Sequence, residues 1–205
     1  MTDFPLIVSY YTKDTMYQLE VQNLIASCEQ WGVEYLVEPI ASFGSWESNC
    51  CYKPFFLMQK LEQLKRPLFW VDADAVLVRQ PEFLDLFNLD FVVRSNAYLD
   101  DLHDSKVMSG SLFVNATAGG AQVLKLWGKA CLAAFSNPAR EEEIWDQIVL
   151  RQVLQAGVLG ATIGALPVEY LAIVGYAEDE AVVRNPVICH HQASRRFKKI
   201  INNAL

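Results

Sequence analysis

Residues 67–74 read Pro67-Leu68-Phe69-Trp70-Val71-Asp72-Ala73-Asp74, an apolar run that ends in two carboxylates one residue apart. A short continuous apolar run of this kind is typical of a strand buried on both faces of a sheet. The two acids would then follow the carboxyl end of the strand, where open α/β sheets bind ligands. Side chains one residue apart on an extended chain face opposite ways, so we expect a turn to begin at Asp72.

A turn that brings both carboxylates together would offer hard oxygen ligands, which suit Mg²⁺ or Mn²⁺. Such ions keep several waters and often bind the phosphates of a substrate. The sequence therefore predicts a divalent metal site at Asp72 and Asp74. The alternative is a loop whose acids are merely solvated, because short motifs often match by chance.

The composition of the chain limits the classes of protein to which it can belong. With 205 residues, 52% of them apolar, the sequence predicts one domain with a large core. A formal net charge of −7 excludes nucleic acid as the expected partner, because neutralising phosphates requires a basic surface. No stretch approaches the ~20 uninterrupted apolar residues of a membrane span. The first residues lack a basic region before an apolar one, and we expect a cytoplasmic protein. The five cysteines form no CxxC pair, so we expect reduced thiols.

Hydrophobic periodicity and turn residues predict alternating strands and helices on both sides of the Asp72 motif. The predicted strands are Leu6–Tyr10, Val33–Ile40, Leu68–Val71, Asp90–Arg94, Gly110–Val114, Leu166–Val174 and Pro186–Cys189, with Val76–Val78 also extended. The predicted helices are Thr15–Gln30, Tyr52–Lys65, Pro81–Phe87, one that carries Leu124 and Trp127, and Glu141–Gln155. The segment Asn96–Lys106 is polar, and we expect it to be mobile. This alternation predicts an α/β fold with a single, mainly parallel sheet flanked by helices.

The Asp72-Ala73-Asp74 motif, preceded by the Tyr52-Lys53-Pro54 helix start, resembles the nucleotide-sugar-dependent glycosyltransferases of the GT-A fold. The likeness is strongest to glycogenin-like and bacterial lipopolysaccharide galactosyltransferase-like enzymes. It implies a metal-dependent transferase that moves a sugar from a nucleotide-diphosphate donor, expected to be a UDP-sugar, to an acceptor hydroxyl. The acceptor could be a glycan, a lipid-linked glycan or a protein. It also implies one GT-A domain over residues 1–205, with a nucleotide-binding half at 1–80 and an acceptor- and sugar-binding half at 81–205.

Four further segments follow in the order that the family uses. Tyr11-Thr12-Lys13-Asp14-Thr15-Met16-Tyr17 is similar to the first loop of the family, which implies that Tyr11, Thr12 and Tyr17 line the base and ribose pocket. These tyrosines could instead pack in the core. The strand Ser109 to Asn115 is similar to the one that ends in an asparagine, which implies a donor-binding role for Asn115.

Trp145-Asp146-Gln147-Ile148-Val149-Leu150 resembles the D-Q-D-x-L-N box of the family, with Ile148 in place of the second acid and Arg151 in place of the asparagine. The resemblance implies that Asp146 and Gln147 are the catalytic residues that hold the donor sugar near C1. In a retaining enzyme Gln147 would shield the oxocarbenium face, whereas in an inverting one Asp146 would be the general base. The plain alternative for Asp146 is a charge on a solvated helix.

His190-His191-Gln192-Ala193-Ser194-Arg195-Arg196 resembles a terminal segment in which a histidine precedes a small residue by three places and a basic one by six. Counting from His190 reaches Ala193 and Arg196, so the likeness implies His190 as the third metal ligand, with His191 as the alternative. Arg196 and Lys53 could then add charge-assisted hydrogen bonds to the diphosphate, although Lys53 could equally be a surface lysine.

The sequence also allows two other functions and a contact with lipid. Asp72 and Asp74 also resemble the first motif of haloacid-dehalogenase-type phosphatases, where one aspartate is a nucleophile and the other an acid or base. A silent module that binds a nucleotide sugar without turnover is the other alternative, because the Asp146 box is incomplete. The basic, amphipathic end at Ser194–Leu205 could make a weak peripheral contact with anionic lipid.

Overall fold

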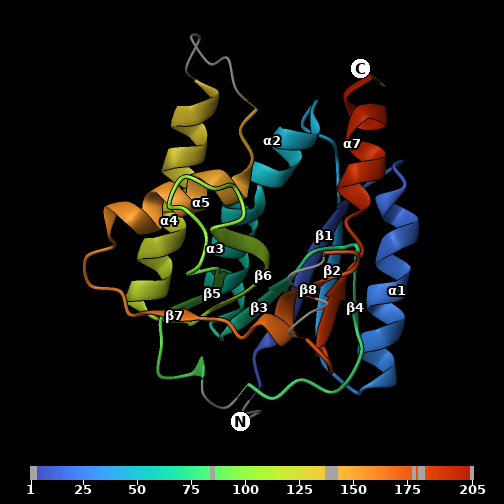
Figure 1. Cartoon of the computed structure of the whole chain (residues 1–205), viewed down its shortest axis with the longest axis horizontal. Coiled ribbons are helices and arrows are strands. Elements are labelled where there is room, and N and C mark those ends of the chain that lie inside the picture. The colour runs from blue at the N-terminus through green and yellow to red at the C-terminus, as the bar shows by residue number, and fades with distance from the viewer. Residues whose placement is uncertain (1–3, 84–85, 137–142, 177–178, 180–182, 204–205) are drawn as a thin grey trace.

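The computed structural model describes residues 4–83, 86–136, 143–176, 179 and 183–203. Six strands form the larger sheet, in the order β2-β1-β3-β6-β5-β7 (Figure 1). They are β1 (Leu6–Thr12), β2 (Tyr35–Ile40), β3 (Leu68–Val71), β5 (Phe91–Ser95), β6 (Val107–Val114) and β7 (Ile163–Ala165). A smaller sheet has the order β4-β9-β8, formed by β4 (Ala75–Leu77), β8 (Ala172–Ile173) and β9 (Ile188–His190).

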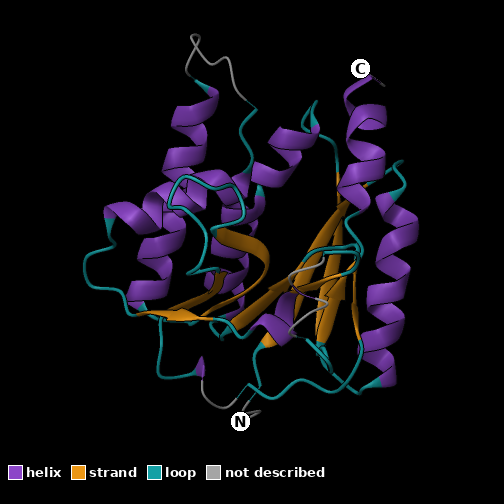
Figure 2. Ribbon diagram, in the orientation of Figure 1, coloured by secondary structure: helices purple, strands orange, loops and turns teal. Residues whose placement is uncertain are grey.

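Helices cover both faces of the larger sheet, as Figure 2 shows. They are α1 (Tyr17–Gln30), α2 (Trp46–Cys51), α3 (Lys53–Leu64), α4 (Ala118–Phe135), α5 (Asp146–Ala156), α7 (Ala193–Asn203) and the 3-10 helix η2 (Val168–Leu171). Helices α3, α4 and α5 pack together on one face, whereas α1 lies against β1 and β4 on the other. Within the described ranges, no helix combines the length and apolar character that crossing a bilayer requires.

The apolar run of β3 is explained by the burial of both of its faces. Leu68 and Trp70 lie in the core cluster shared with α3 and α4, whereas Phe69 and Val71 lie in the second cluster, which includes Leu24 of α1. Alternate residues of a strand point to opposite faces, so a strand buried on both sides has to be apolar at every position. This arrangement confirms the predicted α/β class and places Asp72 where the strand leaves the sheet.

The larger sheet is mixed, and the second sheet was not predicted. Strand β1 pairs in parallel with β2 and β3, but β6 runs antiparallel to both β3 and β5. The connection from β5 returns directly into its neighbour β6, which reverses the strand direction there. Strand β9 pairs antiparallel with β4, so that His190 lies opposite Ala75, the residue after Asp74. The small sheet thus brings residues far apart in the sequence to the end of β3.

Several element boundaries differ from the prediction. Helix α2 was missed, although the hydroxyl of Ser45 caps it by accepting a hydrogen bond from the Ser48 amide. The predicted strand Leu166–Val174 is mostly the 3-10 helix η2 followed by the two residues of β8. The predicted helix at 141–155 begins at Asp146, while residues 137–142 lie outside the described part of the chain, as do residues 84 and 85 of the predicted helix at 81–87. All five cysteines are free thiols, as expected.

Asp90 joins its own segment, just before β5, to two others that are far from it in the sequence. Its carboxylate accepts hydrogen bonds from the Thr117 hydroxyl at 2.5 Å, the Thr162 amide at 2.7 Å and the Thr162 hydroxyl at 2.8 Å. These bonds, Thr117 first, lower the pKa of Asp90. We expect Asp90→Ala to lower the melting temperature by about 4 °C, because charge-assisted hydrogen bonds are lost.

The stabilisation by Asp90 should depend on pH in a defined direction. A carboxyl group whose pKa is lowered by folding stabilises the fold above its unfolded pKa of about 3.9 and loses this effect as the pH falls through the folded value. Thermal unfolding should therefore separate Asp90→Ala from the wild type at pH 7 and bring the two together in acid. Glu62→Ala, at an exposed site on α3, is the control. Equal melting temperatures at pH 7 would contradict the assignment.

Candidate active site

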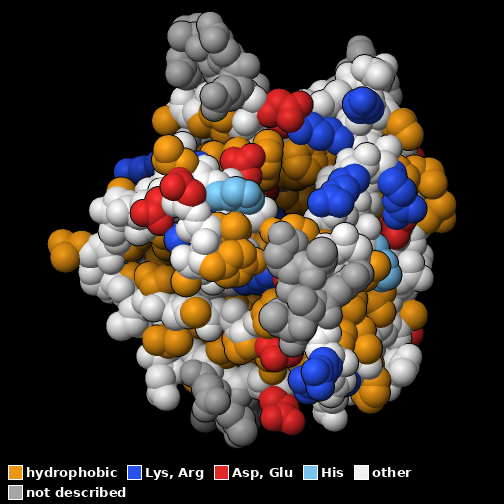
Figure 3. Space-filling model, viewed as in Figure 1, with side chains coloured by type: hydrophobic (Ala, Val, Ile, Leu, Met, Phe, Trp, Pro, Cys, Tyr) orange, Lys and Arg blue, Asp and Glu red, His pale blue; other side chains and the backbone are white. Residues whose placement is uncertain are grey.

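A cleft of about 310 Å³ opens at the carboxyl ends of β1 and β3, and Figure 3 shows it as the hollow beside the basic side chains of α7. Residues from both halves of the chain line it. Among the predicted site residues, those lining the cleft are Tyr11, Thr12, Tyr17, Lys53, Asp72, Asp74, Asp146, Gln147 and His190. The fold therefore brings together residues that are separated by as much as 179 positions in the sequence, from Tyr11 to His190.

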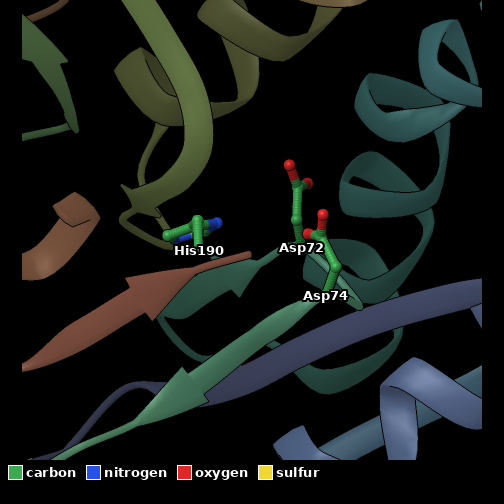
Figure 4. Close-up of side chains that lie close together, drawn as sticks. All are labelled: Asp72, Asp74 and His190. Carbon is green, nitrogen blue, oxygen red and sulfur yellow. The ribbon is translucent and has the colours of Figure 1, made fainter. Parts of the chain in front are cut away.

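Asp72, Asp74 and His190 form a compact group in which one possible ligand atom from each residue lies within 4.8 Å of the others. The expected turn is present, because the Ala75 amide donates to the Asp72 carbonyl at 3.1 Å. In Figure 4 both carboxylates point the same way from this turn, and the imidazole lies beside them. The adjacent His191 is exposed at the surface, so the structure favours His190 in the cleft.

The imidazole of His190 is oriented by its neighbours on β6. Its Nε2 atom lies 2.9 Å from the Ser111 hydroxyl, which leaves Nδ1 on the side of Gly110 and Asp72. A methyl group at Gly110 would lie 3.0 Å from Cε1 and 3.1 Å from Nδ1 of His190, so glycine provides the room for the ring. Burial, followed by the positive charge of Lys53, lowers the pKa of His190 to about 3. The ring is therefore neutral at pH 7 and can act as a metal ligand.

Asp74 is a buried carboxylate that has no cationic partner in the part of the chain that the structure describes. It accepts a hydrogen bond from the Ala193 amide at 2.6 Å, yet the ion pairs formed by the described residues include none with Asp74. Burial, followed by the charge of Asp72, raises the pKa of Asp74 to about 6. A buried charge of this kind needs a positive partner. Two carboxylates and a neutral imidazole are a donor set that fits Mn²⁺ or Mg²⁺.

Lys53 bridges the two acidic parts of the cleft. Its Nζ atom lies 3.0 Å from Asp72 Oδ1 and 2.8 Å from Asp146 Oδ2, and it donates to the Ser109 carbonyl at 3.1 Å. Burial alone would lower the pKa of Lys53, but the carboxylates of Asp146 and Asp72 raise it above its ordinary range. These three partners engage all three N–H groups of the ammonium. Lys53 therefore has no free donor for the predicted hydrogen bond to a diphosphate.

Asp146 is buried at the first position of α5, which contradicts the alternative of a solvated helix charge. Besides Lys53, it accepts a hydrogen bond from the Ser109 hydroxyl at 2.7 Å. The neighbouring Gln147 accepts from the Ser109 amide at 3.3 Å and donates to the Asp104 carbonyl at 2.8 Å. Gln147 lines the cleft, and its two hydrogen bonds connect β6 with the loop that precedes β6.

The segment 96–106, which the sequence predicts to be mobile, is hydrogen-bonded to α5. Arg151 donates from Nη1 to the Leu102 carbonyl, and Gln155 donates to the Asp101 carbonyl at 2.7 Å. Together with Gln147, these residues form a stripe at four-residue spacing on α5, which is one face of a helix. Arg151 stands where the family box has an asparagine, and its role here is to hold the 96–106 segment against α5.

Two predicted binding residues lie away from the cleft. Asn115 uses its side-chain amide to donate to the carbonyls of Phe87 and Leu89, at 2.9 and 3.0 Å, which stabilises the turn before β5. Arg196 points toward α1 and pairs with Glu20 at 2.8 Å. Its neighbour Arg195 lines the cleft instead, because successive residues project from a helix in different directions. The structure thus contradicts the predicted positions of Asn115 and Arg196.

Two tryptophans at the cleft were not assigned a role from the sequence. Trp46 of α2 and Trp145, just before α5, line the cleft with ring centres 6.1 Å apart. The Nζ atom of Lys198 lies 4.5 Å from the Trp46 ring centre and 5.2 Å from that of Trp145. The Trp46 indole also donates to the Tyr17 hydroxyl at 3.2 Å. The cleft is therefore walled by aromatic rings between α1, α2 and α5.

A sequence model described as nucleotide-diphospho-sugar transferase matches residues 49–199, which include the metal-ligand candidates, Lys53 and the Asp146 box. The chain belongs to this family. Its overall fold is similar to a solved structure described as a glycosyltransferase involved in the glycosylation of the major capsid of PBCV-1. The TM-score is 0.67, with 15% sequence identity over 98% of each chain, so this likeness shows the fold alone. No curated protein sequence matches the chain.

Membership of the nucleotide-diphospho-sugar transferase family decides between the two enzyme classes that the sequence left open. The protein is a glycosyltransferase of α/β, GT-A-like fold that uses a nucleotide-diphospho-sugar donor. The phosphatase interpretation of Asp72 and Asp74 is wrong, because the motif lies within the segment that matches the transferase family. The closer likeness to glycogenin-like enzymes stays a prediction.

Proposed function

We propose that this transferase moves a sugar from a UDP-sugar to an acceptor hydroxyl and depends on Mn²⁺ or Mg²⁺. The observation that supports this proposal is the placement of Asp72, Asp74 and His190 within 4.8 Å of one another in a cleft that also contains Asp146. A divalent ion held by these three residues would supply positive charge for a diphosphate leaving group. Asp74 has a raised pKa and no ion-pair partner among the described residues, so it is the residue that such an ion would stabilise most.

The nucleotide is proposed to bind at the β1 end of the cleft. Tyr11, Thr12 and Tyr17 line this end, and Trp46 adds an aromatic wall next to Tyr17. Aromatic side chains of this kind bury one face of a base while their polar edges remain available for hydrogen bonds. A pyrimidine is the base that the family resemblance implies, and the donor panel described below tests it.

The diphosphate is proposed to lie against the start of α7. Arg195 projects into the cleft there, and no carboxylate lies within ion-pair distance of it among the described residues. Arg195 therefore takes the role that the sequence gave to Arg196, and its guanidinium can donate two parallel hydrogen bonds to phosphate oxygens.

The donor sugar is proposed to bind beside Asp146. Because Lys53 and the Ser109 hydroxyl fix this carboxylate, its remaining acceptor capacity can be directed at a sugar hydroxyl. Gln147 has both ends of its amide engaged, so it acts by positioning Ser109 and the 96–106 loop. If the reaction inverts the anomeric centre, Asp146 would be the base that takes the acceptor proton.

A panel of UDP-, GDP-, CMP- and dTDP-sugars, each with and without Mn²⁺, tests this function by calorimetry and by release of the nucleoside diphosphate. We expect heat and turnover with a UDP-sugar only when the metal is present. Binding without turnover on any acceptor would favour the silent module, and no binding by a folded protein would contradict the proposed site. The acceptor and the cytoplasmic location stay predictions.

Metal affinity should fall in mild acid. Mn²⁺ binds the deprotonated carboxylate, so a proton on Asp74 competes with the ion below the pKa of about 6. We expect the Mn²⁺ affinity to be constant above this pH and to fall about tenfold per pH unit below it. His190, with a pKa of about 3, adds no competition until lower pH. Calorimetric titration from pH 7.5 to about 5 measures the slope, and a flat profile would contradict this role of Asp74.

A further inference from the structure

The outer surface of α7 carries positive charge and an exposed aliphatic residue. Ala193, Phe197 and Ile201 form the inner face of the helix, which packs with Tyr17 and Trp46. The outward residues are therefore those on the remaining face, Arg195, Arg196, Lys199 and Ile200, all of them exposed. Ile200 is 60% exposed, although its neighbour Ile201 is buried.

The first turn of α1 extends this surface. The rings of Tyr17 and Phe197 lie 5.9 Å apart, and Glu20 pairs with Arg196 at 2.8 Å, so the two helices lie side by side. Met16 and Leu19 at the start of α1 are 46% and 65% exposed. Figure 3 shows basic and apolar side chains adjoining one another in the region of α1 and α7. We call the set Met16, Leu19, Arg195, Arg196, Lys199 and Ile200 the α1–α7 face.

The charge of the α1–α7 face differs from that of the rest of the protein. The segment 193–203 contains four basic residues and no acidic one, in a chain of formal net charge −7. Arg196 is paired with Glu20, and Lys198 turns inward to Glu47 and Glu143. Arg195 and Lys199 have no carboxylate within ion-pair distance among the described residues. The face therefore presents uncompensated positive charge next to exposed aliphatic side chains.

We infer that the α1–α7 face docks on the surface of an anionic phospholipid bilayer. Leu19, Ile200 and Met16 would enter the headgroup layer, while Lys199 would contact lipid phosphates. Arg195, at the edge of the face, lines the cleft and is left to the donor diphosphate. Nucleic acid would match the charge but would leave the aliphatic side chains without an apolar partner. A two-fold contact with a second copy would place the same basic residues of both copies near one another, which opposes association.

Docking in this way would place the cleft at the membrane. Arg195 belongs both to the α1–α7 face and to the lining of the cleft, so the mouth of the cleft adjoins the docked surface. An acceptor anchored in the bilayer could then reach the reaction centre without leaving the lipid. This consequence rests on the proposed transferase function, whereas the docking itself does not.

Co-sedimentation of the full chain with vesicles tests the docking. We expect the protein to pellet with equal parts of phosphatidylcholine and phosphatidylglycerol, to stay in solution with phosphatidylcholine alone, and to be released by high salt. Lys199→Gln should weaken binding about fivefold, since one basic residue near an anionic surface contributes about 1 kcal/mol. The double variant Leu19→Ser and Ile200→Ser should weaken it at least about tenfold. Leu159→Ser is the matched control, because Leu159 is 96% exposed in the connection between α5 and β7.

Three results would overturn the inference. They are no pelleting with the anionic vesicles, pelleting that the double variant leaves unchanged, and a dimer by analytical ultracentrifugation that the double variant dissolves. Hydrolysis of a soluble UDP-sugar without lipid should be the same in the wild type and the double variant. If the double variant loses pelleting but keeps hydrolysis, the defect lies in the α1–α7 face. If the wild type pellets normally but does not hydrolyse the UDP-sugar, the proposed transferase function is contradicted and the docking is not.

Discussion

Asp72→Ala and Asp74→Ala are each expected to lower kcat/KM for the nucleotide sugar by at least about 10³-fold, because each removes a negatively charged ligand from the proposed metal site. Asp74→Ala should lower the melting temperature little, since Asp74 has no ion-pair partner among the described residues. Asp72→Ala should lower it more, because Asp72 pairs with Lys53 and accepts a hydrogen bond from the Trp70 indole, although Lys53 keeps Asp146 as a partner. Steady-state release of the nucleoside diphosphate and calorimetric Mn²⁺ binding give the two readouts. Metal-dependent turnover that survives both substitutions would refute the site.

The two adjacent histidines provide an internal control for this prediction. His190→Ala should weaken Mn²⁺ binding about 100-fold, because it removes the neutral imidazole that lies next to Asp72. His191→Ala should leave the affinity unchanged, since His191 is exposed at the surface and contributes only its backbone amide, which donates to the Asp74 carbonyl. The opposite order would show that the metal is bound in a different register.

Lys53→Met is expected to have the largest effect on both stability and activity. It would leave Asp72 and Asp146 as neighbouring carboxylates, one of them deeply buried, without the ammonium group that bridges them. Removing one partner of a buried ion pair costs about 3–5 kcal/mol, which corresponds to a fall of about 10 °C in melting temperature for a chain of this size. Turnover should be lost as well, because Asp146 loses its fixed orientation.

Lys60→Met is the matched control for Lys53→Met. Lys60 is also buried and lies two turns further along α3, but it pairs with one carboxylate, that of Glu38, which is partly exposed. Its removal should lower the melting temperature by less and leave turnover intact. In the double variant Lys53→Met and Asp146→Asn, part of the lost stability should return without activity, since the unpaired charge is gone. Equal effects of Lys53→Met and Lys60→Met would contradict the bridging role.

The predicted site residues that the structure brings together are, for the most part, those whose placement is fixed by local chain geometry. Asp72 and Asp74 follow a strand that is buried on both faces, and such a strand is recognisable in the sequence as an apolar run. The turn at Asp72 follows from the need to bring two neighbouring side chains together. His190 was identified through a resemblance, and the structure places its ring beside both acids.

The parts that the sequence did not predict depend on tertiary contacts. Arg195 and Arg196 are neighbours of the same type, and only the packing of α7 on α1 decides which of them faces the cleft. Asn115 ends a strand as expected, yet the carbonyls that its amide contacts belong to the distant turn before β5. Lys53 meets three partners from β3, β6 and α5, none of them near it in the sequence.

The pairing of β9 with β4 also affects when the enzyme becomes competent. His190 is made 118 residues after Asp72, and the Ala193 amide that binds Asp74 follows it. A nascent chain that has folded β1 to β6 would therefore still lack His190, one of the proposed metal ligands, and the start of α7. Contacts of such long sequence separation form late. Until residue 190 has been made, the polypeptide would have an acidic turn but no site capable of holding an activated sugar.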